Sequence, residues 1–208
     1  LVSFEGIEEV ELEDQKYARE LGYAIKHIAQ GKLENNIACV SALPTLVNQE
    51  TLLSQVGKEM NALEIFSEGV GSTVYYGPGA GAEPTASAVI ADLVDIAKGG
   101  WELDINSDSS NKLEVSDTQK AARYYRLQVK DEPGAIAKIS SVFGEKEISI
   151  DALIQHEARS KGQLDSVPVV IISGEITDNE AVKLKNTLED LTEVFPGVKK
   201  FRIHTSRS

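Results

Sequence analysis

Basic residues, cysteine and long apolar runs are all scarce in this chain of 208 residues, and each scarcity excludes a class of protein. Lys and Arg number 21 against 33 Asp and Glu, and the formal net charge of −12 opposes a nucleic-acid partner. The single cysteine, Cys39, lies in an apolar stretch, which excludes a disulfide framework and predicts a buried thiol in a reducing, cytoplasmic compartment. No apolar run approaches the ~18 residues that a membrane-spanning helix needs, so no membrane partner is expected.

Metal ligands and catalytic motifs are lacking as well. His27, His156 and His204 are far apart and show no zinc-ligand spacing, so no metal is expected. No Ser-His-Asp motif is present, and we assign no catalytic residue in this chain. The acidic run from Glu8 to Asp14 favours a solvated helix start over a pair of catalytic carboxylates. The first residue is Leu rather than Met, which leaves open whether the chain starts where its gene starts.

The first half of the chain mixes helical and strand-like patterns. Thr85 is expected to cap a helix whose apolar stripe contains Val89 and Leu93. Gly69 lies between two strand-like stretches and predicts a β-hairpin. The expected elements are a helix running into a strand over 13–29, a polar turn over 31–36, a strand over 37–43, a hairpin over 61–68 and 73–76, and a helix over 86–97.

The segment from Asp104 to Ala121 changes the composition of the chain. It is rich in Ser, Asp and Asn and has few apolar residues, which is typical of a linker. We therefore expect an N-terminal part over 1–103, a linker over 104–122 and a C-terminal domain over 123–208.

The C-terminal part alternates strand and helix patterns with turn residues between them. The expected order is a strand at 124–130, a helix at 135–144, strands at 148–156 and 167–173, a helix at 177–191 and a strand at 198–204. This βαββαβ order, in about 80 residues, predicts a ferredoxin-like sheet with two helices on one face. The fold class expected for the whole chain is α+β.

A glycine-rich turn, Gly77-Pro78-Gly79-Ala80-Gly81-Ala82, formally satisfies the G-x-G-x-x-G/A pattern of dinucleotide-binding folds. A strand precedes it and a helix follows, but the helix leads into Trp101 and a polar segment rather than into a second buried strand. The pattern therefore disfavours a phosphate-binding fingerprint. Two interpretations stay open: a tight turn selected only for its backbone conformation, and bare main chain that a flat ligand approaches closely.

These residues resemble the signature of the homoserine dehydrogenases, where the glycine turn is followed by Pro84-Thr85-Ala86-Ser87-Ala88-Val89 and then by Asp92-Leu93. Residues 4–29 and 43–47 (LPTLV) are similar to other pieces of that catalytic domain, and the chain from Tyr124 onward resembles an ACT domain, a regulatory module of many bacterial members. The resemblance covers nearly the whole chain. It implies a partial α/β catalytic domain (for substrate binding and dimerisation) with a mixed sheet, followed by a ferredoxin-like ACT domain.

The implied reaction is the NAD- or NADP-dependent interconversion of L-homoserine and L-aspartate 4-semialdehyde, in threonine, methionine and isoleucine biosynthesis. The resemblance also implies that a Rossmann domain and the family's catalytic lysine would precede Phe4. The chain alone is therefore expected to be inactive, and the cofactor to be bound mainly by that domain. Gly79, Ala80 and Gly81 are the expected cofactor contacts, as a lid over the nicotinamide ring.

The ACT resemblance implies an amino-acid effector, with threonine as the first candidate. The Asp131 carboxylate would pair with the ligand's ammonium group, although capping the next helix is an equally open role. Such sites often lie across a dimer interface, so a homodimer or homotetramer is expected. A second hypothesis treats the chain as a non-catalytic amino-acid-binding and oligomerisation module. The expected effector contacts are Asp131, Gly134, Ala135, Ser149, Ile150, Asp151 and Ala152.

Overall fold

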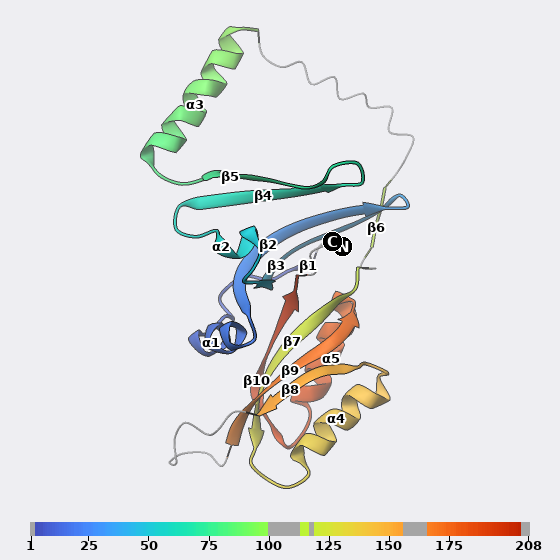
Figure 1. The fold of residues 1–208 in the computed structure, drawn as a ribbon. Helices are drawn as coiled ribbons and strands as arrows, with labels where there is room; N and C mark the ends of the chain where they lie inside the picture. Colours follow the sequence, from blue (N-terminus) through green and yellow to red (C-terminus); the bar gives the residue numbers. More distant parts are fainter. Residues whose placement is uncertain (1–2, 100–112, 117–118, 156–165, 205–208) are drawn as a thin grey trace. The chain divides into compact units, whose positions relative to one another are not determined.

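A computed structural model describes residues 3–99, 113–116, 119–155 and 166–204 (Figure 1). The chain divides into two compact units, one formed by Leu1–Asn48 together with Leu113–Ser208 and the other by Gln49–Lys112. None of the helices within the described ranges is long and apolar enough to cross a bilayer. Most of the expected linker, with Trp101 and His156, lies outside these ranges, and the boundaries at 103 and 122 stay a proposal.

One mixed sheet of eight strands organises the first unit (Figure 1). Along its main path the order is β1-β3-β10-β7-β9-β8, and β2 and β6 also pair with β3. With its flanking helices, this sheet confirms the expected α+β class. The strands are β1 (Ser3–Phe4), β2 (Tyr23–Glu34), β3 (Ile37–Asn48), β6 (Glu114–Val115), β7 (Ala121–Lys130), β8 (Ile150–Gln155), β9 (Ser166–Ile176) and β10 (Val194–Ile203).

The ferredoxin-like prediction is confirmed by the last four strands and two helices. α4 (Ala135–Glu145) follows β7, and α5 (Asp178–Glu189) follows β9. The strand order β10-β7-β9-β8 is antiparallel throughout, as a βαββαβ fold requires. α5 begins with a reciprocal capping box, in which Thr177 and Glu180 each accept a backbone N–H of the other. Both helices pack on one face of the sheet, and the buried core there includes Tyr125, Ile139, Phe143, Leu184 and Leu188.

A further helix, α1 (Leu12–Glu20), contributes to a second core on the opposite face of the same sheet. Tyr124 and Tyr125 are consecutive in β7, so their side chains point to opposite faces. Tyr125 meets Phe143 edge-on in the first core, whereas Tyr124 stacks on Phe201 with ring centroids 5.7 Å apart. The second core contains Tyr17, Ala18, Leu46, Tyr124, Val170, Phe201 and Ile203.

β3 is paired along both of its edges. β2 covers one edge over its whole length in antiparallel register. Three short segments share the other edge, all parallel to β3: β6 at Ile37–Ala38, β1 at Ser41–Ala42 and β10 at Thr45–Leu46. Pro44, which lacks an N–H, falls between the β1 and β10 pairings, where its missing donor is tolerated.

The second unit holds a hairpin and an exposed helix. Its elements are α2 (Leu52–Gln55), β4 (Met60–Ser67), β5 (Gly71–Pro78) and α3 (Ala82–Ala97). β4 and β5 pair only with each other among the described strands, which confirms the expected hairpin. α3 has no buried residue, and the apolar stripe that was expected to pack is exposed, with Leu93 at 60% and Ile96 at 69%.

Several element boundaries predicted from the sequence were wrong. The strand expected to end by Ala29 continues as β2 to Glu34, because Asn35 and Asn36 alone make the turn, both at positive φ. The strand expected to end at Leu43 continues through Pro44 to Asn48, since β1 and β10 extend its pairing. The expected linker contains β6, which pairs with β3 because the N–H groups of Glu114 and Ser116 donate to the carbonyls of Asn36 and Ala38.

Candidate functional site

The glycine corner, residues 77–82, joins β5 to α3 and is the first candidate site. Gly79, Ala80 and Gly81 are all exposed. The N–H groups of Gly79 and Ala80 both donate to the carbonyl of Glu59, at 2.8 and 3.3 Å, which ties the corner to the start of the hairpin. The backbone of the corner is therefore exposed and held in place by these two hydrogen bonds.

Local geometry accounts for two of the glycines. A Cβ on Gly79 would lie 1.7 Å from Nδ2 and 2.4 Å from Cγ of Asn61, so a side chain there would displace that amide. Gly81 has a φ of +117°, a conformation that side chains rarely adopt. Space around Gly81 is otherwise open apart from Pro84, whose Cδ would lie 3.4 Å from an added Cβ. The turn and the ligand-contact interpretations are both compatible with this geometry.

Thr85 does not cap α3 as the sequence predicted. The helix begins one turn earlier, at Ala82, with Gly81 as its N-cap residue. Pro84 is tolerated because the first turn of a helix needs no N–H from it. Thr85 instead donates its Oγ1 hydrogen to the carbonyl of Gly81 at 2.8 Å. The helix N-terminus, with its unpaired N–H groups, thus lies at the glycine corner itself.

The second candidate site is the turn between β7 and α4. Gly134 caps α4 in the left-handed conformation, with φ +92° and no side-chain capping bond. Asp131 is exposed, and across the described residues its carboxylate makes no hydrogen bond or ion pair. The capping role for Asp131 is therefore wrong, because Gly134 occupies that position.

The seven predicted effector residues form two separate groups. Asp131, Gly134 and Ala135 lie at the start of α4 and the end of β7. Residues 149–152 follow the end of α4 and begin β8, where Ile150 pairs with Ser173, which pairs in turn with Arg123 at the start of β7. An 11-residue helix is about 16 Å long. One copy of the chain therefore does not bring the two groups together.

Two buried ion clusters were missed by the sequence analysis. In the first, which we call the α1 clamp, Asp14 is fully buried and accepts from Arg126 Nε at 2.6 Å and from Arg126 Nη2 at 3.1 Å. Glu11 accepts from the same guanidinium at 2.7 Å. The acidic run is thus not simply solvated. Its pairing with Arg126, 112 residues away, could be suspected only from the charges of the two segments.

The second cluster, which we call the β3 clamp, centres on Asp178 at the start of α5. Arg123 donates to its Oδ1 at 2.7 Å, and Arg202 donates to its Oδ2 at 2.6 Å. Arg202 also donates to Ser41 Oγ of β3 at 2.8 Å. Burial opposes ionisation of Asp178, but the two guanidinium groups outweigh it and lower the pKa of this carboxyl. The cluster is therefore ionised at neutral pH.

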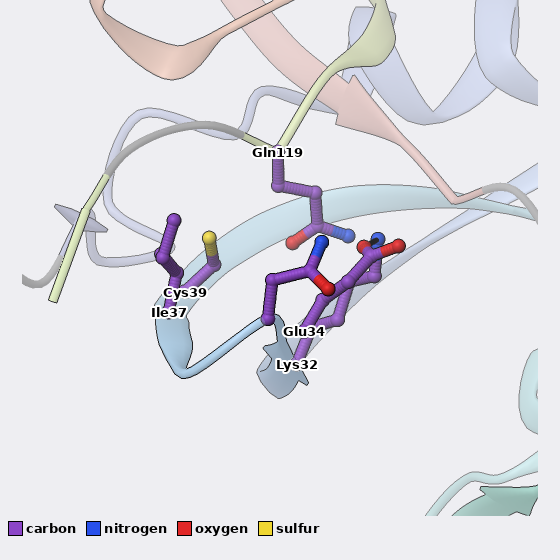
Figure 2. Close-up of a pocket in the computed structure, with 6 residues that line it drawn as sticks. Lys32, Glu34, Ile37, Cys39 and Gln119 are labelled. Atoms are coloured by element: carbon purple, nitrogen blue, oxygen red, sulfur yellow. Dashed lines mark ion pairs between the residues drawn. The ribbon is translucent and has the colours of Figure 1, made fainter. Parts of the chain in front are cut away.

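A cavity of about 120 Å³ lies at the end of the β2–β3 hairpin (Figure 2). Lys32 and Glu34 on its wall pair with each other, and Gln119 closes one side. Its volume is below the ~300 Å³ of usual small-molecule sites, and we assign it no ligand. Within the described ranges, no three His, Cys, Asp or Glu side chains gather as a metal site would require.

Comparison with known proteins matches both parts of the chain. The family model described as homoserine dehydrogenase matches residues 1–94, and that of the ACT domain matches residues 126–190. The homoserine dehydrogenase of Helicobacter pylori is 34% identical over 206 residues, covering 97% of this chain and 48% of that protein. That of Bacillus subtilis is 34% identical over 200 residues, covering 93% and 45%.

Solved structures agree with the sequence matches. The crystal structure of a homoserine dehydrogenase from Thiobacillus denitrificans superposes with a TM-score of 0.80 at 29% identity, covering 99% of this chain and 48% of that one. The Staphylococcus aureus homoserine dehydrogenase at pH 7.0 gives a TM-score of 0.59 at 27% identity, covering 96% and 46%. This chain thus spans about half the length of its relatives. It belongs to the homoserine dehydrogenase family and carries an ACT domain.

Proposed function

We propose that this chain acts as part of a longer cytoplasmic homoserine dehydrogenase, which interconverts L-homoserine and L-aspartate 4-semialdehyde with NAD or NADP and is regulated by threonine. The main support for the proposal is that nearly the whole chain, from the glycine corner through the ACT sheet, is similar in sequence and structure to homoserine dehydrogenases. We assign the substrate, the pathway and the effector from this similarity to homoserine dehydrogenases.

The glycine corner fits contact with a nicotinamide cofactor. Its main chain is exposed, and a helix N-terminus adjoins it. When bound, the cofactor supplies the hydride chemistry. The residues of this chain would only cover it. Gly81 leaves room for a flat ring. The N–H groups of Ala82 and Glu83, which donate to no backbone carbonyl within the described ranges, favour a carbonyl oxygen or an anion nearby. No other cofactor contact is assigned in this chain.

An assay of the complete polypeptide encoded by the gene tests the proposal. We expect NAD- or NADP-dependent oxidation of L-homoserine by that polypeptide and none by the 208-residue chain alone. Absence of turnover by the complete polypeptide with either cofactor would contradict the enzymatic assignment. Threonine binding by the chain, without any turnover, would then support the non-catalytic amino-acid-binding module instead.

The effector site is proposed to lie between two copies of the chain. Within one copy the two groups of predicted contacts lie at opposite ends of α4. β10 is already paired with β3, whereas β8 pairs only with β9 among the described strands, so β8 is the edge left for a second copy. A two-fold pairing of β8 with its counterpart would place residues 149–152 of one copy beside Asp131 of the other, because the two strands would then run antiparallel.

Mixing two variants separates a shared site from a site within one copy. Asp131→Ala and Asp151→Ala chains should each lose heat of binding with L-threonine in calorimetry. If the site is shared, a mixture refolded together should regain about a quarter of the sites, because half of the dimers are mixed and each of these has one intact site. If the mixture shows no heat of binding with L-threonine, the site lies within one copy. Glu132→Ala, a neighbouring exposed carboxylate, serves as the control and should bind normally.

A further inference from the structure

The two family segments share a hydrophobic core. α1 and β3 come from the part matched by the homoserine dehydrogenase model, whereas β7, β9 and β10 belong to the four-stranded ACT sheet. Tyr17 and Leu46 from the first part are each at most 1% exposed, and they belong to one core with Tyr124 and Phe201 of the second. Residues of α1 and β3 of the same chain thus cover the face of the ACT sheet that lies opposite α4 and α5.

The α1 clamp adds buried charge pairing to that core. Arg126 lies on the central strand β7 and is only 7% exposed, so its guanidinium depends on the carboxylates of α1 for compensation. Tyr124 donates its hydroxyl to Asp14 at 3.3 Å from the same strand. Lys199 of β10 pairs with Glu9 and Glu11, at 2.9 and 3.0 Å, on the same side. α1 is therefore held by two neighbouring strands of the ACT sheet.

The β3 clamp fixes β3, the other element from the part matched by the homoserine dehydrogenase model. β10 pairs with β3 in parallel, and His204 N donates to Leu46 O at 2.8 Å just beyond the strand. Arg202 of β10 links Ser41 of β3 to Asp178, the first residue of α5. A displacement of α5 or β10 would thus be opposed by a buried carboxylate that both arginines share.

We infer that α1 and β3 unfold together with the ACT domain as one cooperative body. A change in the stability of the ACT domain therefore changes the stability of these two elements of the catalytic part as well. β7 provides the direct connection, because it carries Arg126 of the α1 clamp and ends at Lys130, immediately before Asp131 in the turn between β7 and α4. The regulatory consequence, that an effector at this turn stiffens α1 and β3, rests on the effector site proposed above.

Native-state hydrogen exchange of the 208-residue chain tests the cooperative body without a ligand. Ile139→Ala weakens the core beneath α4, on the face of the sheet away from α1. We expect exchange of the α1 and β3 amides to accelerate by the same factor as exchange of β7, while the β4–β5 hairpin of the other unit is unchanged. Faster exchange in β7 with unchanged α1 and β3 would overturn the inference.

Three further variants serve as controls for this test. If Ile139→Ala does not fold, Ile139→Val removes a single methylene group and the same comparison applies. Val182→Ala, on the exposed side of α5, is the matched control and should leave exchange unchanged throughout. In Asp14→Asn, whose α1 clamp is weakened, α1 should exchange faster than β7; equal rates would show that the clamp does not carry the coupling.

Exchange with L-threonine present separates the inference from the effector proposal. Protection of residues 131–135 together with α1 and β3 supports both. Protection of the turn alone, with α1 and β3 unchanged, would keep the effector site and overturn the transmission. If the turn is not protected at millimolar threonine, the effector proposal fails, and the Ile139 comparison still decides the cooperative body.

Discussion

Replacing Asp14 by Ala is expected to lower the free energy of unfolding by about 3–5 kcal/mol, the range found when one partner of a buried ion pair is removed. Asp14 is fully buried, and its loss leaves the buried guanidinium of Arg126 without the two hydrogen bonds that this carboxylate accepts, at 2.6 and 3.1 Å. Glu11 would still accept from Arg126, so the lower end of the range is expected.

The measurement is urea unfolding of the 208-residue chain followed by circular dichroism. Glu13→Ala is a control on the same helix, because Glu13 contacts Arg126 at 3.4 Å but its side chain is 47% exposed. An exposed pair of this kind contributes about 1 kcal/mol at most. If Asp14→Ala costs no more than Glu13→Ala, the α1 clamp contributes nothing to the fold. A double variant, Asp14→Leu with Arg126→Met, should recover much of the loss, since it removes both members of the buried charge pair together.

Local signals explain why the ACT part could be predicted from the sequence. Thr177 and Glu180 mark the start of α5 by a capping box, and Gly134 marks the start of α4, so each change from strand to helix is encoded within a few residues. The alternation in β7 and the helical spacing around Ile139 then fix which faces are buried. The order of elements follows without knowledge of any distant contact.

Distant contacts explain what could not be predicted. β10 pairs with β3, more than 150 residues away in the sequence, and no pattern in either strand indicates which strand it pairs with. Asp14 has the same local sequence context as the half-buried Glu13, and only the approach of Arg126 decides which one is fully buried. The α3 stripe shows the converse: its helical period is clear, yet no described residue covers it, because periodicity indicates which face is apolar and not what packs there.

The candidate sites show the same division. The glycine corner was found because glycines, a proline and a helix start follow each other in sequence, and the structure places Gly79, Ala80 and Gly81 together on the surface. The residues predicted to contact an effector form two local groups in the sequence, but their separation along α4 depends on strand register. The arrangement within one copy agrees with the expectation that such a site lies between two copies, and the assignment of these residues to an effector stays a prediction.

Replacing Gly81 by Val in the complete enzyme is expected to lower kcat/KM for the nicotinamide cofactor by about 100-fold or more, the usual cost of misplacing a reacting group by about 1 Å. Two effects combine. The φ of +117° strains any side chain by about 1–3 kcal/mol, and the Val methyl groups would occupy the open space above the corner where the cofactor ring is proposed to lie.

Gly81→Ala separates these two effects, because it carries the same backbone strain with little added bulk. If the corner covers the cofactor, Val should raise KM for the cofactor and slow turnover well beyond Ala, while both variants unfold at similar urea concentrations. Gly69→Val is the matched control: it lies in the hairpin turn of the same unit, and a Cβ there meets nothing within 4 Å. Kinetics of Gly81→Val equal to those of Gly69→Val would remove the corner from the active site, because the proposed lid would then tolerate a branched side chain at its point of contact.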